Sequence, residues 1–200
     1  MLSVSDLTRA GLGPISFTVD DGGCLAVTGP SGAGKTLLLR AIADLDPNNG
    51  VVHAGDRERR EVPAPQWRRQ VGFVPAESGW WADNVGDHFA EPDLAKPIID
   101  QLGLPQEALD WQVARLSTGE RHRLALARTL ALKPDILLLD EPTAALDKDA
   151  TAKAEEIIRT QMEHGVSIVL VTHEAGQVRR MADAVLTIKD GRAGAPEPVK

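Results

Sequence analysis

Short apolar runs alternate with segments of helical periodicity along most of the chain. The apolar runs predict buried strands at residues 24–28, 71–74, 136–139, 167–171 and 185–189. Amphipathic repeats predict helices at residues 35–44, 121–132, 148–164 and 174–181. Alternation of this kind favours an α/β fold with a mainly parallel sheet flanked by helices. Shorter strands expected at residues 3–6 and 15–19 add a small antiparallel edge.

One long stretch interrupts this alternation. Residues 77–113 carry short helical patches and several prolines, but no strong strand pattern. We therefore expect a single domain of residues 1–192, with a helical subdomain at approximately residues 77–133 inserted in it. The remaining residues, 193–200, are rich in proline and glycine and are expected to form a flexible tail.

A glycine-rich segment follows the first buried strand and precedes the first helix. Its residues Gly29, Gly34, Lys35 and Thr36 match the pattern G-x-x-x-x-G-K-[ST]. In such a loop the backbone N–H groups surround phosphate oxygens, the lysine meets the β- and γ-phosphates, and the hydroxyl meets Mg²⁺. The alternative is a glycine turn without function. The predicted nucleotide-binding residues of this segment are Gly29, Pro30, Ser31, Gly32, Ala33, Gly34, Lys35, Thr36 and Leu37.

Two adjacent carboxylates end the strand expected at residues 136–139. Asp140 and Glu141 therefore lie at the carboxyl edge of the predicted sheet, where open α/β sheets bind ligands. Asp140 can hold Mg²⁺, and Glu141 can orient the attacking water or accept its proton. The alternative is that both are solvated loop residues. The phosphate loop in the same chain favours the catalytic interpretation.

Three further segments follow one another in the second half of the chain. Leu116–Glu120 reads L-S-T-G-E and opens a basic helix; Ile136–Pro142 reads I-L-L-L-D-E-P, and Ala144–Asp147 reads A-A-L-D. Alone, the first would fit an ordinary helix N-cap at Ser117. Together with the phosphate loop they resemble the ATP-binding cassette (ABC) family, with its L-S-G-G-Q signature and S-A-L-D loop. The resemblance extends from residue 1 to about residue 192.

The resemblance implies the ABC ATPase fold, a P-loop NTPase core with a helical subdomain, and assigns several roles. The family's signature meets the γ-phosphate of ATP held by a partner chain, which adds Ser117, Gly119 and Glu120 to the nucleotide-binding residues. A histidine in the position of His173 contacts the γ-phosphate and the region of the catalytic glutamate. The predicted catalytic residues are then Glu141 and His173, and the predicted Mg²⁺ ligands are Thr36 and Asp140, with Glu77 as an additional candidate.

The resemblance also implies a function. It indicates an ATPase that binds MgATP, forms a homodimer with ATP at the interface and drives a separate polytopic membrane permease. Such a subunit is cytoplasmic and is held at the inner face of the cytoplasmic membrane through the permease. The alternative within the family is a non-transport ATPase for cell division or cofactor assembly. A small-molecule kinase shares the phosphate loop but has no use for the signature. The transported substrate, its direction and the permease are not encoded in these motifs.

Three departures from the family pattern bear on mechanism. The family's Q-loop glutamine is replaced by Ala76, so either the neighbouring Glu77 supplies the Mg²⁺ contact or the coupling route differs. No aromatic residue precedes the phosphate loop in residues 7–14, which leaves the base selectivity open. The insert between Ala76 and Ser117 is shorter than the family usually has. Trp80 and Trp81 lie in it just after the Q-loop position; either one of them is exposed as a partner anchor or both are buried in the small subdomain.

Composition and charge narrow the remaining possibilities. The formal charge of −7 and the pI of about 5.2 disfavour a nucleic-acid partner, which would need a basic face. The single cysteine, Cys24, excludes an intrachain disulfide and is expected to be buried. We see no signal peptide, and the apolar runs are too short to cross a bilayer. The other histidines, His53, His88, His122 and His164, are interpreted as surface or packing residues.

Overall fold

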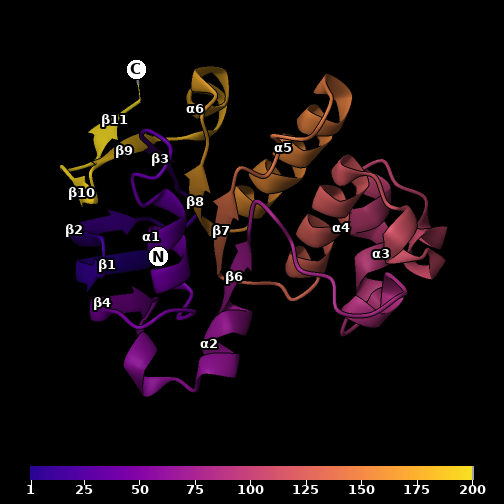
Figure 1. The fold of residues 1–200 in the computed structure, drawn as a ribbon, viewed down its shortest axis with the longest axis horizontal. Coiled ribbons are helices and arrows are strands. Elements are labelled where there is room, and N and C mark those ends of the chain that lie inside the picture. The colour runs from indigo at the N-terminus through magenta and orange to yellow at the C-terminus, as the bar shows by residue number, and fades with distance from the viewer. Residues whose placement is uncertain (200) are drawn as a thin grey trace.

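The computed structural model describes residues 1–199 and places them in two sheets with helices packed around them (Figure 1). The larger sheet has seven strands in the order β10-β9-β3-β8-β7-β6, with β11 paired to β9. Strands β9, β3, β8 and β7 and the edge strand β6 run parallel. Their bounds are β3 (Cys24–Thr28), β6 (Val71–Val74), β7 (Ile136–Asp140), β8 (Ser167–Val171) and β9 (Ala184–Lys189). The predicted fold class is confirmed.

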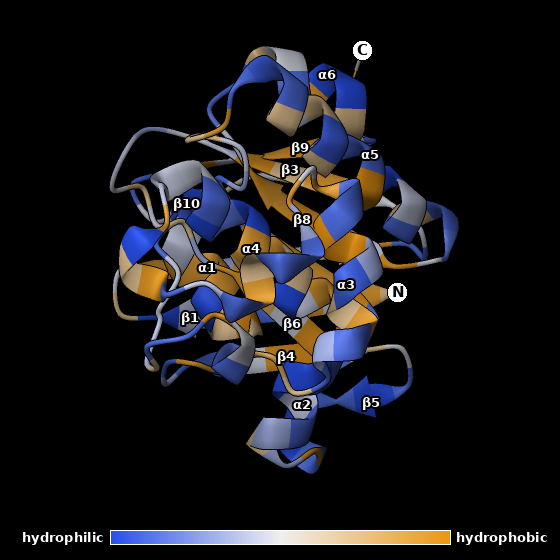
Figure 2. Ribbon diagram, turned by 90° about the vertical axis from the view of Figure 1, so that its right-hand side faces the viewer, coloured by the Kyte–Doolittle hydropathy of each residue, from blue (hydrophilic) through white to orange (hydrophobic). Residues whose placement is uncertain are grey.

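Both faces of the large sheet are covered. Strands β7 and β8 are buried at every residue, which explains why the sequence shows continuous apolar runs there rather than alternation. The covering helices are α1 (Lys35–Ile42), α2 (Ala64–Gln70), α4 (Thr118–Leu130), α5 (Lys148–Glu163) and α6 (Ala175–Met181). Figure 2 shows the hydrophobic strands β3, β8 and β9 behind helices whose visible faces are largely hydrophilic.

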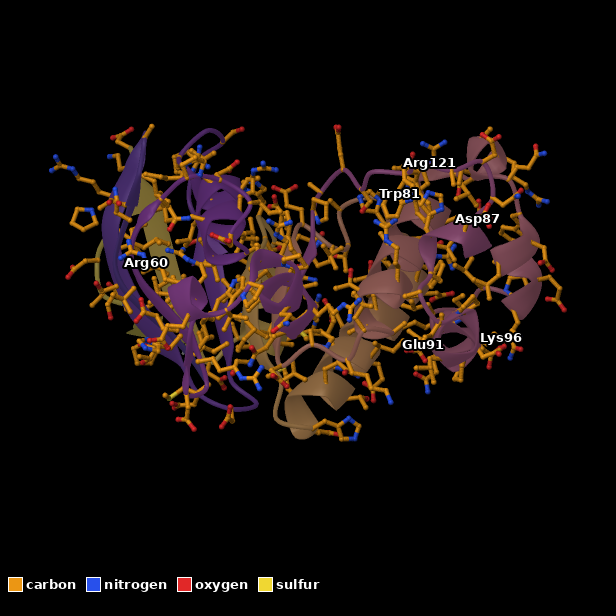
Figure 3. The ribbon with its side chains drawn as sticks, turned by 90° about the horizontal axis from the view of Figure 1, so that it is seen from below. Arg60, Trp81, Asp87, Glu91, Lys96 and Arg121 are labelled. Atoms are coloured by element: carbon orange, nitrogen blue, oxygen red, sulfur yellow. The ribbon has the colours of Figure 1, made fainter. Side chains whose placement is uncertain are left out.

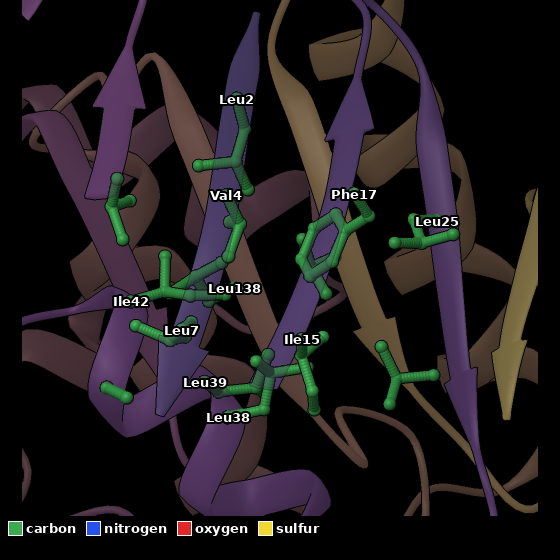
Figure 4. Packing of buried hydrophobic residues seen from close by; sticks show 14 of the residues in the cluster. Leu2, Val4, Leu7, Ile15, Phe17, Leu25, Leu38, Leu39, Ile42 and Leu138 are labelled. Atoms are coloured by element: carbon green, nitrogen blue, oxygen red, sulfur yellow. The ribbon is translucent and has the colours of Figure 1, made fainter. Parts of the chain in front are cut away.

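A four-stranded antiparallel sheet forms the expected edge, but it is larger than the sequence indicates. Its order is β2-β1-β4-β5, with β1 (Leu2–Arg9), β2 (Leu12–Val19), β4 (Asn49–Ala54) and β5 (Arg57–Glu58). Strand β4 was not predicted, because its apolar stretch is only Val51 and Val52 and its pairing partner β1 lies far away in sequence. Figure 4 shows how Leu2, Val4 and Phe17 of this sheet pack toward α1 and the large sheet.

Residues 77–133 hold α3 (Pro92–Gln101), α4 (Thr118–Leu130) and the 3₁₀ turns Gly86–His88, Gln106–Asp110 and Val113–Arg115. A further 3₁₀ turn, Arg59–Glu61, leads into α2. Helix α4 begins three residues before the predicted Arg121, since Ser117 caps it. Helix α1 ends two residues before the predicted Asp44, whose φ of +56° is incompatible with a continuing helix.

The chain terminus differs from the flexible tail expected for residues 193–200. Strands β10 (Arg192–Ala193) and β11 (Glu197–Pro198) both pair antiparallel with β9. The backbone N–H of Val199 also donates to Asp183. Pro198 is tolerated because it lies on an edge strand. Lys200 lies outside the described residues.

Two further sequence expectations concern burial. Cys24 is 2% exposed, and burial together with the nearby charge of Asp183 raises the pKa of its thiol to about 12. Within residues 1–199, no helix combines the length and the apolar character needed to span a bilayer.

Candidate functional site

The phosphate loop connects the end of β3 to the start of α1. At Gly29, with φ of +139°, an added Cβ would lie 2.0 Å from the Ile188 carbonyl oxygen, so only glycine fits. Among residues 1–199, no side chain caps α1, whose N-cap residue is Gly34. The orphan N–H groups of its first turn are therefore free to bind an anion. Pro30, Ser31, Gly32 and Thr36 are exposed at the mouth of the loop, Gly29 and Leu37 are half-buried, and Ala33, Gly34 and Lys35 are buried.

The Lys35 ammonium lies inside this loop. Its Nζ donates to the carbonyl oxygens of Gly29 and Pro30, at 2.9 Å each. Lys35 is only 6% exposed, so its charge is held where the loop closes rather than in solvent. Phosphate oxygens at the loop would offer the same ammonium stronger, charged acceptors.

Thr36 and Asp140 bring an oxygen pair together next to the phosphate loop. The Thr36 hydroxyl donates to Asp140 Oδ2 at 2.7 Å, joining α1 to the end of β7. Burial is the main cause that raises the pKa of Asp140 above its ordinary value, and the Glu141 charge adds to it; the Thr36 hydrogen bond offsets part of the effect. Hard oxygen ligands of this kind suit Mg²⁺, and a cation there would relieve the buried charge.

Glu141 and His173 form a second pair at the same edge of the sheet. His173 Nε2 lies 2.7 Å from Glu141 Oε1. Both side chains are partly exposed, so a water molecule can reach them. Glu141 follows β7 in the left-handed region, with φ of +52°, and its N–H donates to the Val171 carbonyl at the end of β8. A strained residue held by its neighbours is typical of a functional position.

A buried network behind this pair was not predicted. Gln177 Nε2 donates to Thr143 Oγ1 at 2.9 Å and to Glu155 Oε1 at 3.2 Å, so α6 is tied to the loop after Glu141 and to α5. Burial alone would raise the pKa of Glu155, but hydrogen bonds from Arg180 and Gln177 hold it below its ordinary value. The network stabilises the two segments that carry Glu141 and His173.

The signature residues start α4. The Ser117 hydroxyl accepts from the Glu120 N–H, and the Glu120 carboxylate accepts from the Ser117 N–H at 2.8 Å, which forms a capping box. The hydrogen bond from the Ser117 backbone lowers the pKa of Glu120. An added Cβ at Gly119 would lie 3.3 Å from the Ala145 carbonyl oxygen, so the signature lies beside the A-A-L-D loop.

The structure brings together Lys35, Thr36, Asp140, Glu141 and His173, but not the signature residues. Figure 1 shows α4 and α1 on opposite sides of β6 and β7. The N-terminal turn of α4 therefore lies apart from the chain's own phosphate loop. This is the separation that the family resemblance implies.

The Q-loop position is the end of β6 and the loop after it. Glu77 is exposed and lines a cavity of about 450 Å³ together with Ala76, Ser78, Leu116, Thr118, Arg121 and His122. Within residues 1–199, no hydrogen bond or ion pair joins Glu77 to Thr36 or Asp140. Its role as a Mg²⁺ ligand stays a prediction.

The tryptophan pair is divided between the interior and the surface. Trp81 is 73% exposed, whereas Trp80 is half-buried against the helical subdomain. The guanidinium of Arg128 lies 4.9 Å and 5.0 Å from their rings, a cation–π arrangement that the sequence did not reveal. His88 is buried and accepts from the N–H groups of Trp81 and Ala82, which agrees with its predicted packing role.

Comparisons with known proteins agree with this geometry. The profile of the family described as ABC transporter matches residues 12–144. The chain is 34% identical to the arginine transport ATP-binding protein ArtM of Bacillus subtilis over 88% of this chain and 80% of that one. It is 37% identical to the aliphatic sulfonates import ATP-binding protein SsuB of Escherichia coli, over 92% of this chain and 73% of that one. It covers only 51% to 60% of three longer import ATP-binding proteins.

Solved structures share the fold. The chain superposes on the structure of an ATP-binding subunit of an ABC transporter with a TM-score of 0.88 and 23% identity, over 99% of this chain and 90% of that one. At this identity the likeness bears on the fold alone.

Proposed function

This chain belongs to the ABC transporter family as an ATP-binding, ATP-hydrolysing subunit, and we propose that two copies close around ATP to drive a separate membrane permease. The observation that carries the proposal is the separation of the signature from the phosphate loop. Each holds part of an anion site, and only a second copy can bring the two parts to one nucleotide. Two such chains would form two identical shared sites related by a two-fold axis.

The phosphates of ATP bind where Lys35 now contacts loop carbonyls. The backbone N–H groups of the loop and the first turn of α1 surround the β- and γ-phosphates. Lys35 exchanges its contacts with Gly29 and Pro30 for charged phosphate oxygens, which are better acceptors. The absence of an aromatic residue in residues 7–14 leaves the phosphates, rather than the base, as the main source of affinity.

Thr36 and Asp140 would hold Mg²⁺, because their oxygens are adjacent and, within residues 1–199, no cationic side chain forms an ion pair with the buried Asp140 carboxylate. When bound, the ion neutralises charge that develops on the phosphate oxygens. Glu141 orients the attacking water and accepts its proton. His173 donates to Glu141, which keeps that carboxylate aimed at the nucleotide.

The permease and the place of the chain at the membrane belong to this proposal as well. Trp81 is a large apolar side chain in water, next to the Q-loop position, and such residues are enriched at protein interfaces. We place the permease contact on this surface and the chain at the inner face of the cytoplasmic membrane. A non-transport ABC ATPase would share the same site and differ in its partner, so the polytopic protein that copurifies from membranes distinguishes the two.

A mixing experiment tests the shared site. Lys35→Ala disables a chain's own phosphate loop, and Ser117→Arg places bulk where the partner's γ-phosphate must bind. Each variant alone should hydrolyse ATP at a small fraction of the wild-type rate. In a mixed dimer one site carries both lesions and the other carries neither, so mixing should restore part of the activity. Normal hydrolysis by Ser117→Arg alone would disprove the shared site.

A further inference from the structure

Helix α4 contacts β6 toward its C-terminal end and the loop after β6 toward its N-terminal end. Toward its C-terminal end it packs closely on β6, since an added Cβ at Gly72 would lie 2.7 Å from Thr129 Cγ2. Toward its N-terminal end, His122 Nε2 lies 2.6 Å from the carbonyl oxygen of Ala76, two residues after β6 ends. The other ring nitrogen lies 2.9 Å from the Thr118 carbonyl within the helix.

The chemistry of these contacts assigns the direction of the hydrogen bond. Carbonyl oxygens only accept, so a ring nitrogen this close to the Ala76 carbonyl must carry the N–H that donates to it. The Thr118 carbonyl is an ordinary helix acceptor. The contact of 2.6 Å with Ala76 is the shorter one, and we assign the N–H to it. His122 is therefore a tie between two segments that are 46 positions apart in the sequence.

The position of His122 along α4 lets this hydrogen bond restrict the orientation of the helix. Seven residues separate Thr129 from His122, which is about 10 Å at 1.5 Å per residue. Gly119 lies three residues further, about 4–5 Å beyond the tie. A contact at that distance from the packed end limits the angle of α4 against the sheet, and thereby the position of the signature.

The loop that receives the tie also carries the exposed tryptophan. Arg128 of the same helix donates to the Gly79 carbonyl at 3.2 Å and stacks against Trp81. Residues 76–81 are thus held by α4 at two points. Figure 3 labels Trp81 and Arg121 in the helical subdomain; Trp81 is exposed there and Arg121 is half-buried.

We propose that His122 is a positioning residue that fixes the signature helix relative to the Q-loop segment, in a chain whose Q-loop side chain is only a methyl group. The tie makes residues 76–81 and the N-terminal turn of α4 move as one body. Without it, the N-terminal part of α4 keeps the hydrogen bonds of Arg121 to the Val113 carbonyl and of Arg123 to the Leu102 carbonyl, but neither of these reaches residues 76–81. Closing the shared site must then restrict more motion of that loop. The inference rests on the proposed shared site, because it assigns the signature a ligand on a second copy.

Three variants test the tie. His122→Ala removes the donor, and His122→Gln keeps an N–H donor on a flexible side chain. His164→Ala, at the C-terminal end of α5, is the matched control. The readouts are hydrogen exchange of residues 76–81 in the nucleotide-free chain and dimerisation with a slowly hydrolysed ATP analogue. Two further readouts are the melting temperature and the ATP affinity of the monomer. The affinity is measured by calorimetry at protein concentrations too low for dimers.

We expect His122→Ala to speed exchange in residues 76–81 and to weaken dimerisation by roughly 2- to 12-fold, the range of one hydrogen bond. Monomer affinity for ATP should stay near wild type, the melting temperature should fall by no more than a few degrees, and His122→Gln should recover most of the loss. Unchanged exchange and dimerisation in His122→Ala would overturn the proposal. A glutamine variant as impaired as the alanine variant would also overturn it. So would a loss of dimerisation that is fully explained by unfolding of the variant. If the wild type itself forms no ATP dimer, the shared site fails, while the exchange measurement still decides the tie.

Discussion

Changing the Glu141 carboxylate to an amide removes its ability to accept a proton while it preserves the size and position of the side chain. In the wild type, His173 Nε2 lies 2.7 Å from Glu141 Oε1. In Glu141→Gln the side chain keeps its length, and the amide oxygen can still accept a hydrogen bond from His173 Nε2. The amide cannot accept a proton from the attacking water. Loss of a general base typically costs about 10²–10⁴ in rate, or about 3–5 kcal/mol of transition-state stabilisation. Because the phosphate contacts persist, we expect kcat to fall by that factor with little change in KM.

The assay is phosphate release at saturating MgATP, together with size-exclusion chromatography in the presence of ATP. The variant should accumulate as an ATP-bound dimer, since closure occurs and hydrolysis does not follow. Glu174→Gln is the matched control: it makes the same chemical change at an exposed carboxylate next to His173, and its rate should match wild type. Hydrolysis by Glu141→Gln at the wild-type rate would remove Glu141 from the mechanism.

Two further predictions concern the metal site. Asp140→Asn should lower the Mg²⁺ affinity roughly 10- to 100-fold and yet stabilise the nucleotide-free chain. Burial raises the pKa of Asp140 in the folded state. The free energy of unfolding of the wild type therefore decreases as the pH rises past the ordinary aspartate range, whereas the asparagine variant does not lose this stability. Melting curves should therefore show a gap between the variant and wild type that widens from acidic to neutral pH, and parallel curves would contradict this account. If Glu77 replaces the missing glutamine, Glu77→Ala should raise the Mg²⁺ requirement of hydrolysis roughly 10-fold and adding Ala76→Gln should recover part of it. An unchanged Mg²⁺ titration would make Glu77 a solvated loop residue.

The features predicted well from sequence are those encoded by adjacent residues. The phosphate loop is a contiguous segment between a strand and a helix, and the oxygen pair of Thr36 and Asp140 follows once β3 and β7 belong to one parallel sheet. The cap at Ser117 is likewise local, although the predicted helix began three residues late. The exposed Trp81 could be placed near the Q-loop but not assigned to the surface, because exposure depends on how the helical subdomain packs.

The features that were missed depend on contacts between distant segments. Strand β4 exists because it pairs with β1, and its own residues carry only a weak strand signal. Gln177 and Thr143 are 34 positions apart, so nothing local marks either as part of the support behind Glu141. His122 was interpreted as a surface or packing residue for the same reason. Its partner is a backbone carbonyl, which has no sequence signature at all.

The burial of Cys24 has a practical consequence for following this protein in solution. Only the thiolate reacts with alkylating and maleimide reagents, and a thiol that is 2% exposed with a pKa of about 12 forms almost none at neutral pH. The folded chain therefore behaves as cysteine-free toward such reagents. A fluorophore or spin label can be attached to one introduced surface cysteine without removing the native one. Reaction of Cys24 itself then reports only the fraction of molecules that have unfolded.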